Sequence, residues 1–213
     1  DKGAEEIKAR LTVKGFDDPD LMALVERGDT EAPTVSQNAR SMAIQMIASQ
    51  RWCLQLGDVK GAFLESDPLD RPAGPIYMAQ PPGGLPEEHP DVLIRLDSPL
   101  YGLNDAPKRW YLKFVKEATR IGFQQSRLDP CLFYAKDNEG KLKGILVIHV
   151  DDVITGGAGK QYEEMIKALR ACLPFRKWRV GGGDFCGAEL RQDADFNISI
   201  SQAAFAQKMR LLK

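Results

Sequence analysis

The chain has 213 residues, 43% of them hydrophobic, and a formal net charge of -1. This length suits one large domain or two small ones that share an interface, and it is sufficient to bury a core without a disulfide or a structural metal. The slightly acidic balance excludes a protein that binds nucleic acid with its whole surface, because neutralising phosphates requires clustered Lys and Arg; a local basic groove remains compatible with it.

The first part of the chain predicts a strand, a helix and a second strand. Ile7–Phe16 has the pattern of a short basic strand. Thr34–Gln50 has apolar residues at helical spacing, with Ser36 in position to cap the first turn. Residues alternate in character from Trp52 to Asp58, which predicts a strand with Asp58 at its end.

The middle of the chain combines a proline-rich stretch with an amphipathic helix. Prolines are concentrated between Pro68 and Pro90, so regular structure there must be short, with Ile76–Met78 as the strand-like piece. A helix is predicted from Asp105, which can cap it, to Gly122, which can end it.

The last part predicts more strands and helices. We expect strands at Cys131–Ala135 and Ile198–Ser201, an apolar hairpin at Ile145–Ile154, an amphipathic helix at Gln161–Leu173 and a final helix from Gln202. This order predicts an α+β fold with an antiparallel sheet. The final helix is cut off by the end of the chain, which we interpret as a sign of a longer polypeptide.

Nothing in the composition indicates secretion or a membrane. No apolar run is long enough to cross a bilayer, and the first residues lack the apolar stretch of a signal peptide. The cysteines form no C-x-x-C pair, so we expect reduced thiols rather than disulfides or a zinc site. We therefore expect an intracellular protein, cytoplasmic or nuclear.

The most informative residues are the adjacent acids Asp151 and Asp152, which lie between two β-branched apolar runs. A hairpin here would be at least half buried, and burying ionised carboxylates is costly unless something compensates. A divalent cation such as Mg²⁺ is an economical compensation. The alternative from the residues alone is a turn whose two aspartates face water, since Asp is favoured in turns.

Asp58 favours the metal-binding interpretation. Strands of one sheet could place Asp58 beside Asp151, giving a carboxylate pair able to hold two metals about 4 Å apart. Such a pair would activate a 3′-hydroxyl and stabilise the charge on a leaving pyrophosphate. Phosphoryl transfer needs mainly positioning and electrostatics, so a few carboxylates and cations are sufficient. Taken alone, Asp58 would be interpreted as a surface or capping aspartate.

These acids belong to a longer series of matching segments. In chain order, the sequence resembles the reverse transcriptase domain of Ty1/copia retrotransposons through nearly its entire length. Each segment alone is a weak signal, and their shared order makes the resemblance specific. The segments are Lys8–Leu11 with Lys14–Phe16, Ala32-Pro33, Asp58–Lys60 with Ala62–Leu64, Ile76–Met78 with Gln80–Gly83, Leu100–Leu103 with Ala106-Pro107 and Trp110-Tyr111, Asp129–Leu132, and Val150–Asp152.

The resemblance implies a right-hand polymerase with fingers and palm that adds dNTPs to a primer 3′-OH as an RNA-directed DNA polymerase. Asp58, Asp151 and Asp152 would be catalytic and would bind the metal, Mg²⁺ with Mn²⁺ as an alternative. Phe63 would be a steric gate against a 2′-hydroxyl, although in isolation it would be interpreted as an ordinary core phenylalanine. The other nucleotide-binding residues implied are Lys8, Arg10, Tyr101 and Gly102.

The resemblance also implies boundaries and partners. Residues 1–57 would be mainly fingers, 58–68 the first catalytic segment of the palm, 69–110 mainly fingers and their connection, 111–200 palm, and 201–213 the start of a truncated thumb. The partners would be dNTPs and a primer on an RNA or DNA template, without a membrane. The chain would be part of a longer polyprotein with integrase and ribonuclease H.

The chain departs from the family pattern at several positions. His149 stands where the family has tyrosine, and Asn104-Asp105 replace a Lys-Gln pair, which removes a positive charge from the expected groove. Asp17–Glu31 is unlike the usual connection, and Phe185–Gly187 matches a Phe-Leu-Gly turn in part. These departures favour a second hypothesis, a catalytically weak or inactive reverse transcriptase-like module that binds nucleic acid or is structural. The intact acidic residues count against it.

A third hypothesis is a palm-like nucleotidyl cyclase, prompted by the string Gly181–Phe185. Glycine runs before an aspartate are more often turns, and this one lacks flanking apolar strands. We therefore expect a turn here.

Overall fold

The computed structural model describes residues 11–207 and 209, which form two compact units. Unit 1 comprises Asp1–Ala32 and Phe63–Lys113, and unit 2 comprises Pro33–Ala62 and Phe114–Lys213. The expected boundary at residue 57 is not a boundary between these units, because residues 33–57 group with the segment that carries Asp58. The names fingers, palm and thumb stay predictions.

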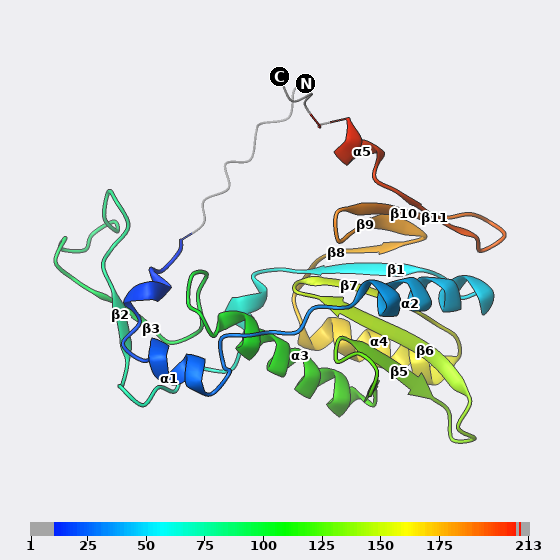
Figure 1. Ribbon diagram of the computed structural model, residues 1–213, viewed down its shortest axis with the longest axis horizontal. Helices are drawn as coiled ribbons and strands as arrows, with labels where there is room; N and C mark the ends of the chain where they lie inside the picture. The colour runs from blue at the N-terminus through cyan, green and yellow to red at the C-terminus, as the bar shows by residue number, and fades with distance from the viewer. Residues whose placement is uncertain (1–10, 208, 210–213) are drawn as a thin grey trace. The chain divides into compact units, whose positions relative to one another are not determined.

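Unit 2 is built on an antiparallel sheet of six strands (Figure 1). The strands stand in the order β4-β5-β6-β7-β1-β8, so β1 from the early part of the chain inserts between two later strands. The mixed helix and antiparallel sheet class is as predicted. The bounds are β1 Gln55–Val59, β4 Gln124–Gln125, β5 Leu132–Lys136, β6 Leu142–His149, β7 Asp152–Gly157 and β8 Phe175–Val180.

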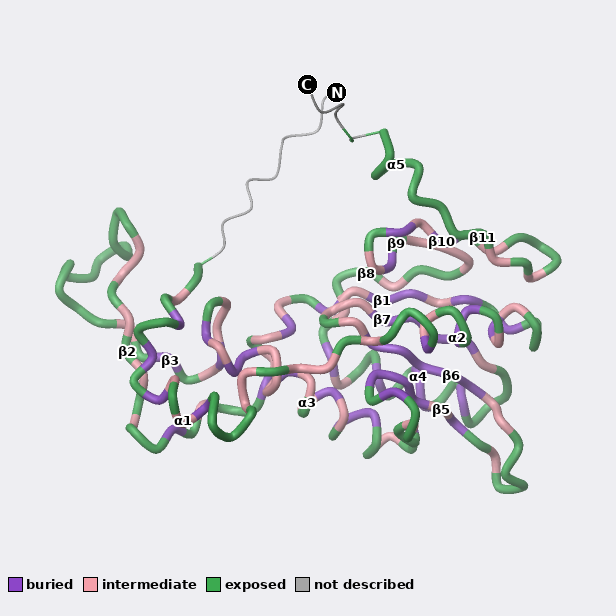
Figure 2. The backbone as a smooth tube through the Cα atoms, in the orientation of Figure 1, coloured by how far each residue is buried: buried purple, intermediate pink, exposed green. Residues whose placement is uncertain are grey.

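Helices cover both faces of this sheet, and the strands between them are largely buried (Figure 2). On one face, Ile44 and Ile47 of α2 (Gln37–Ser49) pack in a buried cluster with Leu56 and Ile154. Ser36 caps α2 as predicted, its side chain accepting a hydrogen bond from Ala39 N at 3.1 Å.

The opposite face packs against α4 (Lys160–Cys172) and α3 (Ala106–Ile121). The hydroxyl groups of Tyr162 and Thr155 lie 2.8 Å apart, and the rings of Phe114 and Phe133 meet edge to face with centroids 5.8 Å apart. α3 ends at Gly122, as predicted, where the backbone takes a φ of +115°.

A smaller sheet completes unit 2 and corrects one prediction. It contains β9 (Gly182–Phe185), β10 (Ala188–Gln192) and β11 (Ile198–Ser201), and α5 (Ala203–Ala206) follows. The turn predicted at the glycine run is wrong, because most of that run forms β9, paired with β10. Glycine allows this close pairing, since a Cβ at Gly182 would lie 2.7 Å from the Leu190 carbonyl oxygen.

Unit 1 has little regular structure around a small apolar core. Its elements are the 3₁₀ helices η1 (Gly15–Asp17) and η2 (Ala62–Glu65, which begins in unit 2), α1 (Leu21–Glu26), and the paired strands β2 (Ile76–Met78) and β3 (Ile94–Leu96). Leu96, Leu103 and Ala106 form the buried core.

The strand predicted at Ile7–Phe16 is wrong for its described part. Residues 11–14 have no regular structure and Gly15 begins η1. The physical reason lies in the residue to which Val13 is bonded. Val13 N donates to Tyr101 O at 2.7 Å, but Tyr101 lies in a turn, which does not present the series of hydrogen-bonding groups that a strand needs. Among the described residues, no helix is long and apolar enough to span a membrane.

Candidate active site

Four polar side chains form a row across four neighbouring strands of the larger sheet. Lys177 of β8 is the register partner of Asp58 on β1, Asp58 is the partner of Asp152 on β7, and Asp152 is the partner of His149 on β6. Directly opposed residues share a face. This row lies on the α2 face, because residues two positions away on the same strands pack in the α2 cluster.

The third predicted acid lies in the two-residue turn between β6 and β7. Val150 in this turn has a φ of +55°, a region that costs a β-branched residue on the order of 1–3 kcal/mol. The next residue is held from outside the hairpin, since Val59 N donates to Asp151 O at 2.9 Å. The structure therefore brings Asp58, Asp151 and Asp152 together; their catalytic role stays a prediction.

Burial raises the pKa of the Asp152 carboxyl to about 6, and the negative charge of Asp151 is the next contribution. Asp58 and Asp184 add smaller contributions in the same direction, while the backbone N–H of Cys186 donates to the carboxylate and opposes them. The surroundings of Asp152 therefore disfavour its ionised form.

This pKa predicts a pH dependence of stability for the metal-free protein. The folded state holds a proton on Asp152 up to about pH 6, whereas an unfolded aspartate loses it near pH 4, so the free energy of unfolding falls as pH rises between those values. Asp152→Asn should therefore gain stability over the parent chain as pH rises from 4.5 to 7.5, measured by urea unfolding with a chelator.

Asp193→Asn is the matched control. The pKa of Asp193 is lowered by its hydrogen bonds with Asn197, so its contribution is complete above pH 4 and is lost only below. The control should differ from the parent chain by a constant amount over the same range. A constant difference for Asp152→Asn as well would contradict the prediction.

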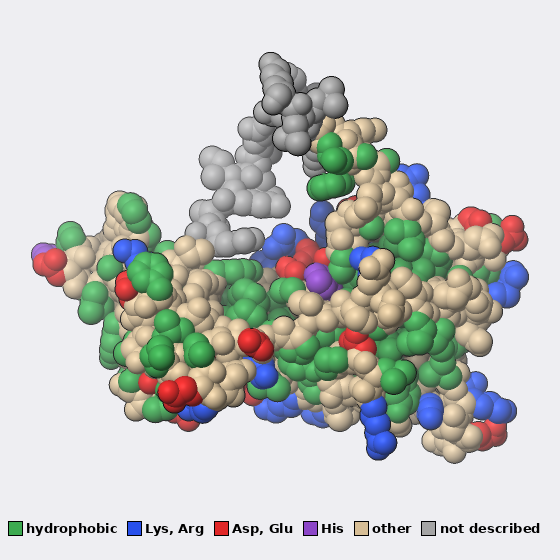
Figure 3. Space-filling view, in the orientation of Figure 1, with side chains coloured by type: hydrophobic (Ala, Val, Ile, Leu, Met, Phe, Trp, Pro, Cys, Tyr) green, Lys and Arg blue, Asp and Glu red, His purple; other side chains and the backbone are tan. Residues whose placement is uncertain are grey.

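A cavity of about 190 Å³ opens beside the row of polar residues. Asp58, Asp152 and Asp184 line it together with Lys177 and Arg179 of β8. Figure 3 shows acidic and basic side chains gathered where β1 and β7 lie in Figure 1.

The basic residues of β8 are not among the residues predicted from sequence. A bulge between Asp58 and Val59 shifts the β1–β8 register at Arg176, whose Nε lies 3.9 Å from Asp58 Oδ2. The signal in the sequence is the string Arg176-Lys177-Trp178-Arg179, which reads as a solvated strand face unless its pairing with β1 is known.

The acids fit a divalent cation by donor chemistry. All are carboxylates, the ligands that Mg²⁺ and Mn²⁺ prefer, and their mutual repulsion at Asp152 calls for positive charge. In the part of the chain that the structure describes, however, no group of three or more His, Cys, Asp or Glu side chains already converges on a common point. The metal ligands stay a prediction.

His149 is packed beside the acids. Its ring meets the ring of Phe185 edge to face, with centroids 6.3 Å apart. Its Nδ1 is buried without a hydrogen-bond partner among the described residues. The imidazole thus helps to hold the β9–β10 hairpin, whose Cys186 N–H reaches Asp152.

The predicted nucleotide-binding residues that the structure describes lie in unit 1. The rings of Phe63 and Tyr101 pack with centroids 5.0 Å apart, and Phe63 also borders the apolar core. Gly102 has a φ of +98° and touches the backbone of Val13 so closely that a Cβ would overlap the Val13 carbonyl. Lys8 and Arg10 lie outside the described residues.

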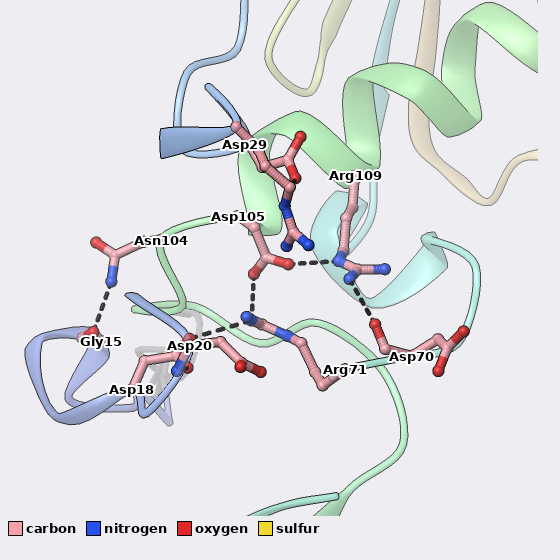
Figure 4. A network of polar contacts seen from close by, with 10 residues as sticks. Gly15, Asp18, Asp20, Asp29, Asp70, Arg71, Asn104, Asp105 and Arg109 are labelled. Carbon is pink, nitrogen blue, oxygen red and sulfur yellow. Dashed lines mark hydrogen bonds and ion pairs between the residues drawn. The ribbon is translucent and has the colours of Figure 1, made fainter. Parts of the chain in front are cut away.

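The Asn104-Asp105 departure has a structural explanation (Figure 4). Asn104 Nδ2 donates to Gly15 O at 2.6 Å. The Asp105 side chain is 2% exposed and binds the guanidinium groups of Arg71 and Arg109. The charge of Asp105 is therefore buried and paired inside unit 1, and the loss of a positive charge from the expected groove stays a prediction.

Comparison with known proteins shows the family of the chain. The model of a family described as reverse transcriptase (RNA-dependent DNA polymerase) matches residues 1–211. The chain belongs to this family. As a reverse transcriptase domain it is 30% identical over 158 residues to the retrovirus-related Pol polyprotein from transposon RE1 of Arabidopsis thaliana, and 31% identical over 153 residues to that from transposon TNT 1-94 of Nicotiana tabacum.

These similarities confirm the resemblance to copia-type reverse transcriptase domains. They cover 74% and 72% of this chain but 10% and 11% of the relatives, so the chain spans about a tenth of their length. Among solved structures, telomerase from Candida albicans in complex with a fragment of telomeric RNA has a TM-score of 0.47 and 10% identity, over 88% of this chain and 37% of that one.

Proposed function

We propose that this reverse transcriptase domain is the RNA-directed DNA polymerase core of a copia-type retrotransposon polyprotein, and that it adds dNTPs to a primer 3′-OH by two-metal phosphoryl transfer. The observation that supports this most is the gathering of Asp58 of β1, Asp152 of β7 and Asp151 of the turn before it, with Asp58 and Asp152 lining a polar cavity. Family membership supplies the reaction class.

In this proposal the three carboxylates hold Mg²⁺, or Mn²⁺, which when bound activates the primer hydroxyl and stabilises the leaving pyrophosphate. The strained β6–β7 turn fixes the direction of Asp151 and Asp152 before any ligand arrives. Lys177 and Arg179, which line the same cavity, offset the negative charge of phosphate groups. Arg176, whose Nε lies 3.9 Å from Asp58 Oδ2, offsets part of the Asp58 charge.

The residues of unit 1 would bind the nucleotide. Phe63, supported by the Tyr101 ring, is proposed as the gate against a 2′-hydroxyl, and the backbone at Gly102 is proposed to border the nucleotide. Lys8 and Arg10 are proposed for the triphosphate on the resemblance alone. On this assignment residues 1–57 and 69–110 are mainly fingers, 58–68 and 111–200 are palm, and 201–213 are the start of a thumb.

The proposed partners follow from the same assignment. They are dNTPs and a primer on an RNA or DNA template. The relatives are named Pol polyproteins, which supports a longer product that also contains integrase and ribonuclease H.

The test is primer extension on an RNA template with dNTPs and Mg²⁺, comparing the chain with Asp151→Asn. We expect extension by the parent chain that disappears in the variant and when a chelator removes the metal. Absence of extension from a folded parent chain, including a version extended beyond residue 213, would contradict the proposal. A primer–template titration at graded salt would then test the inactive module, since phosphate contacts give a salt-dependent affinity.

A further inference from the structure

We infer that Arg71 is a positioning residue for the incoming nucleotide, because it ties the segment Val13–Asp20 to the turn Leu100–Asp105. The inference rests on the proposed function. It concerns unit 1 alone and adds a residue that the sequence resemblance does not single out.

The Arg71 guanidinium bridges two distant segments inside unit 1 (Figure 4). Its Nη2 lies 3.1 Å from Asp18 Oδ2 and 2.7 Å from Asp105 Oδ1. The side chains of Arg71, Asp18 and Asp105 are 1%, 1% and 2% exposed. Nη2 of Arg71 thus contacts both carboxylates in the interior of unit 1, and moving the Asp18 segment away would leave the Asp18 charge without this partner.

Two other contacts join the same segments at fixed distances. Val13 N donates to Tyr101 O at 2.7 Å, and Asn104 Nδ2 donates to Gly15 O at 2.6 Å. Together with Arg71 they hold the two segments at three points along their length. Such a three-point attachment fixes orientation as well as distance.

A second arginine fixes Arg71 itself. Arg109 on α3 binds the other Asp105 oxygen and donates from Nη2 to the carbonyl of Asp70, the residue before Arg71, at 3.2 Å. The backbone from which Arg71 projects is therefore held to the start of α3, so the bridge is anchored at both ends.

The turn that Arg71 holds carries the residues proposed for the nucleotide. Tyr101 packs on Phe63, and the segment with Val13 packs on the same apolar core as Phe63. A displacement of the turn would therefore move Tyr101 and Gly102 together and would remove the support of Phe63.

The arrangement is better suited to fixing geometry than to adding stability. Buried ion pairs often contribute no more stability than apolar residues of the same size, because removing charges from water is costly. Here the contact with Asp18 is an ion pair alone, since Oδ2 of Asp18, like Nε and Nη1 of Arg71 and Oδ2 of Asp20, is buried without a hydrogen-bond partner among the described residues. An apolar side chain would fill this space at lower cost but would not direct both segments to one point.

The test is single-nucleotide incorporation of dATP opposite a templating uracil, with KM and kcat measured separately and dATP affinity measured by equilibrium competition. Arg71→Lys keeps the charge but is one bond too short to reach both carboxylates. Asp18→Asn combined with Arg71→Met leaves no unpaired charge, because Asp105 keeps Arg109. Arg95→Lys is the matched control, an exposed arginine of unit 1 paired with Asp97.

We expect both Arg71 variants to raise the KM and the dissociation constant of dATP at least tenfold, with kcat changed less than threefold, and the control to match the parent chain. A purely structural role would lower the folded fraction and leave the KM unchanged. An unchanged KM in the folded double variant would overturn the inference while extension by the parent chain upholds the proposed function. If the parent protein neither extends a primer nor binds dATP, both the proposed function and the inference about Arg71 are overturned. If it binds dATP without extending a primer, the dissociation constants of the parent and the Arg71 variants decide the inference.

Discussion

Replacing Asp58 with asparagine is expected to lower the rate constant of nucleotide incorporation about a thousandfold, which corresponds to roughly 4 kcal/mol of barrier. Asp58 stands between Asp152 and Lys177 in the row across the sheet and lines the cavity. Asparagine keeps the shape but removes the charge that would hold the metal. Rapid-quench incorporation of one dNTP gives the rate constant.

Asp184→Asn is the control for Asp58→Asn. Asp184 lines the same cavity, but its side chain is 80% exposed and lies on β9 rather than in the row. It should change the rate less than threefold. Similar losses in both variants would indicate that the cavity acts through its total negative charge, and Asp58 would then have no special role.

The stability of Asp58→Asn should be close to that of the parent chain, because the ion pair between Asp58 and Arg176 is long and partly exposed.

Much of unit 2 was predictable because its patterns are local. The α2 helix follows from its apolar spacing and its Ser36 cap, and the β6–β7 hairpin follows from two apolar runs that flank a pair of acids. The approach of Asp58 to that hairpin was predictable because strands of one sheet can place their acids side by side, where a shared cation would offset the charges.

The rest depended on contacts that no local pattern records. β8 carries three basic residues among its aromatic ones, and only its pairing with β1 shows that Lys177 and Arg179 face the cavity. The glycine run was predicted as a turn because glycine runs before an aspartate are more often turns, but here the absence of a side chain at Gly182 lets β10 approach closely. The buried pairing of Asp105 was not predictable for the same reason, since its partner Arg71 is 34 residues earlier in the chain.

The second large effect is expected at Gly102, where alanine should destabilise unit 1 by at least about 3 kcal/mol. The φ of +98° alone is unfavourable for alanine, and a Cβ would also overlap the Val13 carbonyl oxygen. The overlap is with backbone, which cannot swing aside as a flexible side chain would. Relief requires separating the Val13 segment from the Tyr101 turn, which breaks their hydrogen bond. Hydrogen exchange of unit 1 peptides measures the loss, because separate units need not unfold together.

Gly74→Ala isolates the steric part of this effect. Gly74 has a φ of +94° in the same unit, but a Cβ there meets nothing within 4 Å. The control should therefore cost only the backbone strain, about 1–2 kcal/mol. The difference between the two variants measures how firmly the Val13 segment is held against the turn. Equal losses of stability in the two variants would mean that the Val13 segment moves aside without resistance. That result would contradict a firm attachment by Asn104 and Arg71, and the measurement requires no polymerase activity.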